Sequence, residues 1–168
     1  KGLLTALLMT AALVIGGEAI PTRACAAEPV AIEVASSADL EAAEDTVNAA
    51  TSGEFVIKLT KDIEGAISIS GSCPVTILGD GHTLTIGTRS FIRVNEGTHL
   101  VLGSKDGSDT LVIKGKDGQN NDVPGLLDVW GTCDMYSGVT LADREGNNYF
   151  GGGVTVEGGT FNMHGGTI

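Results

Sequence analysis

Apolar residues alternate with polar ones through most of the chain after Gly53. A period of two places every second side chain on one face, which predicts short β-strands. Turn residues separate the runs, which lie about 8–12 residues apart, as in a β-sandwich, a β-barrel or a β-solenoid. The alternating apolar positions are Phe55, Ile57 and Leu59; Ile67 and Ile69; Val75 and Ile77; Leu84 and Ile86; Ile92 and Val94; Leu100 and Leu102; Leu111 and Ile113; Leu127 and Val129; Val139 and Leu141; Val154 and Val156; and Phe161 and Met163.

Internal repetition selects among these folds. The segments Val129–Leu141 and Val156–Ile168 match at an offset of 27 residues, once each is allowed one extra residue. Val94–Leu100 is a weaker third copy of the first half. A period of this size fits one turn of a solenoid with three short strands. We therefore predict an all-β fold, a parallel β-helix, in which glycines supply the corners between strands.

A helical period precedes the strands. Ser36 and Asp39 have the spacing of a capping box, and apolar residues follow at intervals of three and four. We predict a short amphipathic helix over 38–50 after an extended segment, ended by Thr51-Ser52-Gly53. The helix is placed to cover the N-terminal end of the stack, because an open end exposes strand edges and core.

Three longer polar stretches predict loops at Gly103–Asp109, Gly115–Gly125 and Ala142–Gly152. The sequence stops within a repeat at Gly165–Ile168. We expect the repeating region to be incomplete at this end, and the chain to be the N-terminal piece of a longer protein.

The first residues have the order of a secretory signal peptide. Lys1 is basic, Leu3–Gly17 is uncharged and apolar, and Ala24-Cys25-Ala26 has the small-x-small pattern of a cleavage site. A retained membrane anchor and a lipoprotein modified at Cys25 are the alternatives. The predicted organisation is a signal peptide at 1–27, an entry segment and capping helix at 28–53, and β-helix turns at 54–168. We expect no membrane span after cleavage.

Composition restricts the partners. The net charge of −11 disfavours nucleic acid and anionic lipid, and it repels acidic polysaccharides unless a cation or a basic patch intervenes. Cys73 and Cys133 lie in apolar runs, which favours two buried free thiols over a disulfide.

Two stretches resemble known β-helical proteins. The predicted helix followed by Phe55–Ile63 and Val75–Leu84 resembles the opening turns of the pectin-lyase-like right-handed β-helix superfamily. Gly151–Val154 followed by Phe161–Ile168, ending in Gly-Gly-Thr-Ile, resembles the repeats of bacterial surface proteins and adhesins. The resemblance implies a right-handed parallel β-helix. It leaves the activity open, because such folds include lyases, hydrolases and non-catalytic stalks.

Candidate chemistry is sparse. Polygalacturonases in the superfamily resemble one another in an Asp-Asp pair, a Gly-His-Gly and an Arg-x-Lys, whereas this chain has only Gly81-His82-Thr83. Arg89 and Arg93, with Asp106 and Asp109 just beyond, are the nearest match to the arginine base and calcium of a pectate lyase. Calcium therefore stays an alternative, although no loop matches a calcium motif.

The other candidates are histidines and aromatics. His82, His99 and His164 fall on different predicted turns without a zinc spacing. Trp130 and Tyr136 could stack on a sugar or simply pack. We assign no catalytic, cofactor-binding or metal-binding residue.

These observations favour a non-catalytic, adhesive or structural role for a secreted or bacterial cell-surface protein. Its expected partner is carbohydrate or another host or cell-surface ligand. The first alternative is a polysaccharide lyase or glycoside hydrolase whose catalytic turns lie beyond this fragment. The second is a carbohydrate-binding module, which would bind a glycan without cleaving it. The sequence does not indicate the oligomeric state.

Overall fold

The computed structural model describes residues 28–87, 90–116, 125–142 and 153–168. The predicted signal peptide at 1–27, and most of the predicted loops at 115–125 and 142–152, lie outside these residues. No helix of the described residues is long and apolar enough to cross a membrane. The elements are β1 (Val30–Val34), α1 (Ser37–Ala49), β2 (Phe55–Leu59), β3 (Ile63–Glu64), β4 (Ser68–Ile69), β5 (Val75–Leu78), β6 (Thr83–Ile86), β7 (Ile92–Val94), β8 (His99–Leu102), β9 (Leu111–Gly115), β10 (Leu127–Val129), β11 (Thr132–Met135), β12 (Val139–Ala142), β13 (Val154–Val156) and β14 (Thr160–Met163).

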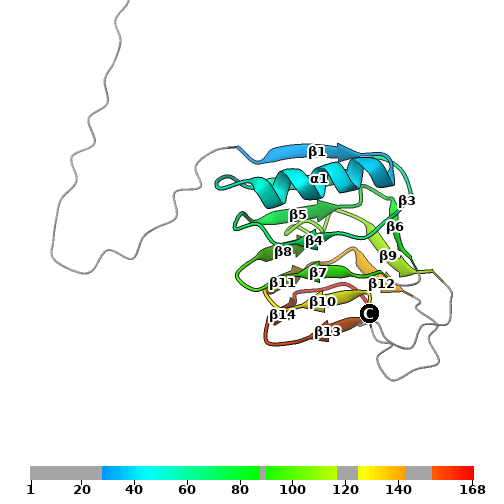
Figure 1. Ribbon diagram of the computed structural model, residues 1–168. Coiled ribbons are helices and arrows are strands. Elements are labelled where there is room, and N and C mark those ends of the chain that lie inside the picture. The colour runs from blue at the N-terminus through cyan, green and yellow to red at the C-terminus, as the bar shows by residue number, and fades with distance from the viewer. Residues whose placement is uncertain (1–27, 88–89, 117–124, 143–152) are drawn as a thin grey trace, which may run out of the picture.

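The strands form three sheets, and all of their pairings are parallel. Sheet A has the order β1-β2-β5-β8-β11-β14, sheet B has β12-β9-β6-β3, and sheet C has β13-β10-β7-β4. From β2 onward the chain visits sheets A, B and C in turn and then returns to sheet A beside its previous strand (Figure 1). The predominantly β architecture is therefore established, and its parallel sheets are compatible with a parallel β-helix.

The apolar side chains of all three sheets enclose one interior. In sheet A the register stacks Ile57, Ile77, Leu102, Met135 and Met163 in a single row. The first four are buried, whereas Met163 on the outermost strand β14 is 49% exposed. Each buried row is stabilised by contacts along the stack, so short strands remain stable only as neighbours of one another.

The predicted helix is present one residue earlier than expected, at Ser37–Ala49. Ser36 caps it, since its hydroxyl accepts a hydrogen bond from Asp39 N at 3.2 Å. Leu40, Ala43 and Val47 join the same apolar cluster as the strands. The helix lies beside β1 at the N-terminal end of the stack and contacts β4 (Figure 1).

One amide side chain connects α1 to sheet C. Asn48 Nδ2 donates to Ser68 O at 2.8 Å, while its Oδ1 accepts from Ser70 N at 2.8 Å and Gly71 N at 3.1 Å. These contacts hold the helix against the end of β4, and so they fix the surface where α1 meets sheet C.

The segments aligned in the sequence lie side by side. Val129 pairs with Val156, Met135 with Met163, and Thr140 with Thr167. In the weaker third copy, Val94 pairs with Val129, but Thr132 pairs with His99 and not with Thr98. The corner between β7 and β8 is therefore longer than the corner between β10 and β11. Two predicted loop boundaries also shift, since β9 continues to Gly115 and β12 to Ala142.

Candidate functional site

Asp106 and Asp109, the aspartates nearest to the pectate lyase pattern, accept hydrogen bonds from backbone amides. Asp109 Oδ2 accepts from Gly79 N at 3.0 Å and its Oδ1 accepts from Asp80 N at 2.8 Å. Asp106 closes its own turn by accepting from Ser108 N at 3.0 Å. No group of three or more acidic, histidine or cysteine side chains in the described parts of the chain could hold a metal ion.

Arg93 does not pair with Asp109; its partner is Asp128. The two residues lie opposite each other on β7 and β10. Arg93 Nη2 and Nε lie 2.8 and 3.0 Å from Asp128 Oδ2. The second arginine of the predicted pair, Arg89, lies outside the described residues.

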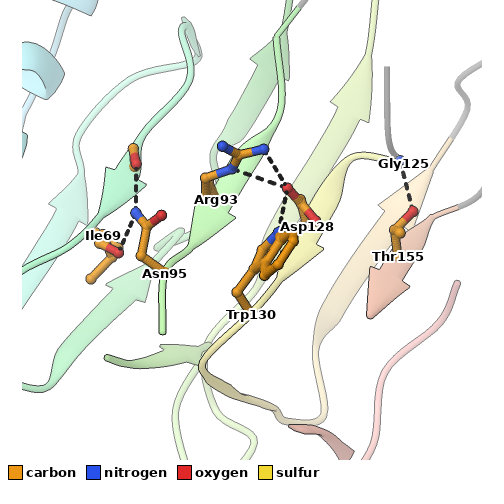
Figure 2. Close-up of polar contacts among 8 residues, drawn as sticks. Ile69, Arg93, Asn95, Gly125, Asp128, Trp130 and Thr155 are labelled. Atoms are coloured by element: carbon orange, nitrogen blue, oxygen red, sulfur yellow. Dashed lines mark hydrogen bonds and ion pairs between the residues drawn. The ribbon is translucent and has the colours of Figure 1, made fainter. Parts of the chain in front are cut away.

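Asp128 is the most deeply buried charged residue on the outer face of sheet C. The residue is 1% exposed, although its side chain lies on the side of β10 away from the apolar interior. Trp130 covers it, because the indole Nε1 donates to Asp128 at 3.1 Å (Oδ1) and 3.2 Å (Oδ2). Figure 2 shows Arg93 and Trp130 directed at this one carboxylate. A buried carboxylate needs such partners, because an unpaired buried charge is strongly unfavourable.

The pair belongs to a polar row that crosses sheet C. The register places Ser68, Arg93, Asp128 and Thr155 side by side on β4, β7, β10 and β13. Asn95, two residues beyond Arg93, donates to Ser68 Oγ and Ile69 O at 3.0 Å each (Figure 2). The outer face of this sheet therefore presents fixed polar groups, in contrast to its aliphatic inner face.

A groove of about 360 Å³ lies where α1 meets this row. Its volume is within the range of ordinary small-ligand sites. The Arg93 guanidinium lies over the Phe91 ring, 4.9 Å from the centroid, which is a cation–π arrangement. The lining residues are Glu44, Ala66, Ile67, Ser68, Ser90, Phe91 and Arg93.

Glu44 is the acidic group of the groove. Burial raises the pKa of this carboxyl; a hydrogen bond from the Ser68 backbone opposes the shift, and the charges of Asp45 and Glu41 reinforce it. Carboxyl groups with a shifted pKa in a concave site are typical of functional surfaces.

A second polar cluster lies on sheet A. His99 Nε2 is 2.7 Å from Asp134 Oδ2, and His164 Nε2 is 3.1 Å from Asp134 Oδ1. Asn162 Nδ2 donates to Asp134 Oδ1 at 2.8 Å. Tyr136 stacks on His164 with ring centroids 4.6 Å apart. Two of the histidines that the sequence assigned to separate turns thus meet at one carboxylate.

The remaining candidates are placed in turns or in the core. His82 lies next to the turn at Asp80 and Gly81, with its Nδ1 3.5 Å from Asp62 Oδ1. Cys73 and Cys133 are both buried free thiols, as predicted.

Comparison with protein-family models, with curated proteins and with solved structures finds no match to this chain. The resemblance to pectin-lyase-like proteins therefore stays a prediction from the sequence motifs.

Sequence reasoning missed Asp128, Asp134 and Glu44. A signal for Asp128 was present, because the alignment of Val94 with Val129 also places Arg93 opposite Asp128. No comparable signal marked Glu44, which only the docking of α1 on sheet C brings beside Phe91 and Arg93.

Proposed function

We propose that this chain is the N-terminal part of a right-handed parallel β-helix, with α1 as its cap, in an exported bacterial surface protein. Its role is adhesive and non-catalytic: it binds carbohydrate on the outer face of sheet C. The solenoid interpretation is supported by the cyclic order in which the chain visits the three parallel sheets. The export and surface location are supported by the signal-peptide pattern of residues 1–27.

The observation that carries the binding proposal is the geometry of Trp130. The residue is 42% exposed, yet its indole N–H is held by the buried carboxylate of Asp128. An aromatic ring fixed in this way loses little conformational entropy when a ligand stacks on it. Sugars present flat C–H faces that suit such a ring, and hydroxyl groups that suit the polar side chains around it.

The neighbouring groups add hydrogen-bonding capacity. Arg93 directs Nη2 and Nε at Asp128, and none of the contacts among the described residues engages the N–H donors of its Nη1. The groove beside it is large enough for a small sugar unit. Because Asp128 neutralises Arg93 and the whole chain is acidic, neutral glycans fit this surface better than polyanionic ones.

The direct test uses the fluorescence of Trp130, which is the single tryptophan of the chain. Titration with neutral oligosaccharides should quench or shift its emission, and calorimetry should give the affinity. Trp130→Ala should weaken binding at least tenfold, about 1.4 kcal/mol. Tyr136→Ala removes an aromatic from the other polar cluster and should leave binding unchanged. If wild type binds none of the neutral glycans, the binding proposal is wrong.

Product analysis tests whether this chain itself cleaves a polysaccharide. The chain is incubated with neutral polysaccharides and with polygalacturonate, and new reducing or unsaturated ends are measured. We expect none. If such ends are released, and Arg93→Ala abolishes their release, the function is polysaccharide cleavage and not adhesion.

A further inference from the structure

Glu44 brings a negative charge to one end of the groove. It lies on α1 between Leu40 and Val47, which are both buried in the core. Its side chain is half-buried and lines the groove with Ser68, Phe91 and Arg93. The carboxylate is thus part of the concave surface, and the docking of the helix fixes its position.

Within the described residues, this charge has no ion-pair partner. None of the ion pairs among the described residues includes Glu44. Arg93 lines the same groove, but its guanidinium pairs with Asp128. Glu41 and Asp45 on the same helix act in the opposite sense, since their charges disfavour the ionised form of Glu44. Among the described residues, the charges that act on Glu44 are therefore negative.

A bound cation would relieve this arrangement. Burial and the two acidic neighbours raise the pKa of Glu44, so that ionising its carboxyl opposes folding at neutral pH. A positive group of the ligand, placed beside Glu44, would stabilise its ionised carboxylate. A metal ion fits poorly, because no set of three candidate ligands comes together in the described parts of the chain. An ammonium group needs only one carboxylate and a few hydrogen-bond acceptors.

We infer that the Glu44 end of the groove binds the free amine of an amino sugar, while the rest of the glycan lies toward Arg93 and Trp130. This inference rests on the proposed carbohydrate-binding function and names its ligand class. An amine on a sugar is favoured over a lysine side chain, because Arg93, which lines the groove, shares Asp128 with the fixed indole of Trp130. These groups suit a hydroxylated ring better than an alkyl chain.

The test compares glucosamine oligomers with the same oligomers after N-acetylation, which removes the positive charge. Calorimetry on the wild-type chain at low salt should show at least tenfold tighter binding of the free amine. Glu44→Gln should abolish this preference, so that this variant binds both oligomers with equal affinity. Because ionised Glu44 does not stabilise the fold, this variant should remain folded, as circular dichroism can verify.

Glu41→Gln is the matched control, because it removes the same charge from an exposed position of the same helix. If Glu41→Gln reduces the preference as much as Glu44→Gln does, the amine is attracted by general acidity and the inference is wrong. Equal affinity of wild type for both oligomers also overturns it, while the proposed function stands. If neither oligomer nor any neutral glycan binds, the proposed function itself fails.

A lysine tetrapeptide separates the two sources of an amine. We expect it to bind at least tenfold more weakly than the glucosamine tetramer and to leave Trp130 emission unchanged. Equal affinity, with displacement of the sugar, would overturn the assignment to an amino sugar.

Discussion

Arg93 and Asp128 are 35 positions apart in the sequence, yet they lie opposite each other on β7 and β10 and share an ion pair of 2.8 Å. Their burial is unequal. The Asp128 side chain is 2% exposed, whereas that of Arg93 is 40% exposed. Water can therefore replace the partner of the arginine but not that of the aspartate, so the two residues respond differently to substitution.

Removing Arg93 should destabilise the fold more than neutralising Asp128. Among the described residues, Arg93→Ala leaves the buried carboxylate with the indole alone as its side-chain partner. We expect a loss of about 3 kcal/mol in the free energy of unfolding. Asp128→Asn keeps the shape and an acceptor for Trp130, while Arg93 becomes hydrated, so the expected loss is about 1–2 kcal/mol. Urea unfolding measures both values. An equal or reversed order would show that Asp128 is not held as the structure indicates.

Local sequence patterns predicted most of the elements and part of their pairing, but the alternating runs did not include β3 or β11. The alternation of Phe55, Ile57 and Leu59 predicted β2, and the helical spacing of Leu40, Ala43 and Val47 predicted α1, because burial on one face sets both periods. The match of Val129–Leu141 with Val156–Ile168 predicted which residues lie side by side.

The polar sites required information that local patterns lack. Asp134 meets His99 and His164 only because the corner at Asn95–Thr98 is longer than the corner at Trp130-Gly131, which shifts the register between β8 and β11. Glu44 reaches its groove only through the docking of α1 by Asn48. Corner lengths and helix docking are tertiary properties, and one sequence did not reveal them.

The stabilisation due to Asp134 should depend on pH. Partial burial acts to raise the pKa of this carboxyl, but hydrogen bonds from Asn162, His99 and His164 outweigh it and lower the pKa. A lowered pKa in the folded state stabilises the fold above the pKa of the unfolded chain, about 3.9, and this contribution is lost as the pH falls through the folded value. Asp134→Asn should therefore lose about 1–2 kcal/mol at neutral pH and progressively less below about pH 4.

Asp106→Asn is a comparison for that experiment, because the lowered pKa of Asp106 predicts a pH dependence of the same sign that arises within a single turn. Hydrogen bonds from Ser104 and Ser108 lower the pKa of Asp106 to about 2, but its partners lie within one exposed turn. Its replacement should disturb that turn without changing the contacts between β8, β11 and β14. A difference between wild type and Asp134→Asn that does not vary with pH would contradict the lowered pKa of Asp134.

Gly138 should be far less tolerant of alanine than Gly97. Both have a positive φ, of 85° and 77° respectively, which L-residues adopt at a cost of about 1–2 kcal/mol. A Cβ at Gly97 would meet nothing within 4 Å, whereas one at Gly138 would overlap the carbonyl oxygen of Asp109. We expect Gly97→Ala to lose about 1 kcal/mol and Gly138→Ala at least about 3 kcal/mol. Similar losses in thermal unfolding would show that the corner at Gly138 is not packed against Asp109.

The two thiols should react only when the fold opens. Cys73 and Cys133 are both buried, and burial also raises the pKa of Cys133, so neither buried sulfur presents an accessible thiolate. Alkylation of the native protein, followed by mass spectrometry of the two peptides, should find them unmodified. In denaturant without reductant both should be alkylated, because neither is in a disulfide. Protection that persists in denaturant and disappears on reduction would instead indicate a disulfide. Rapid labelling of native Cys133 would show that β11 is not enclosed between β8 and β14.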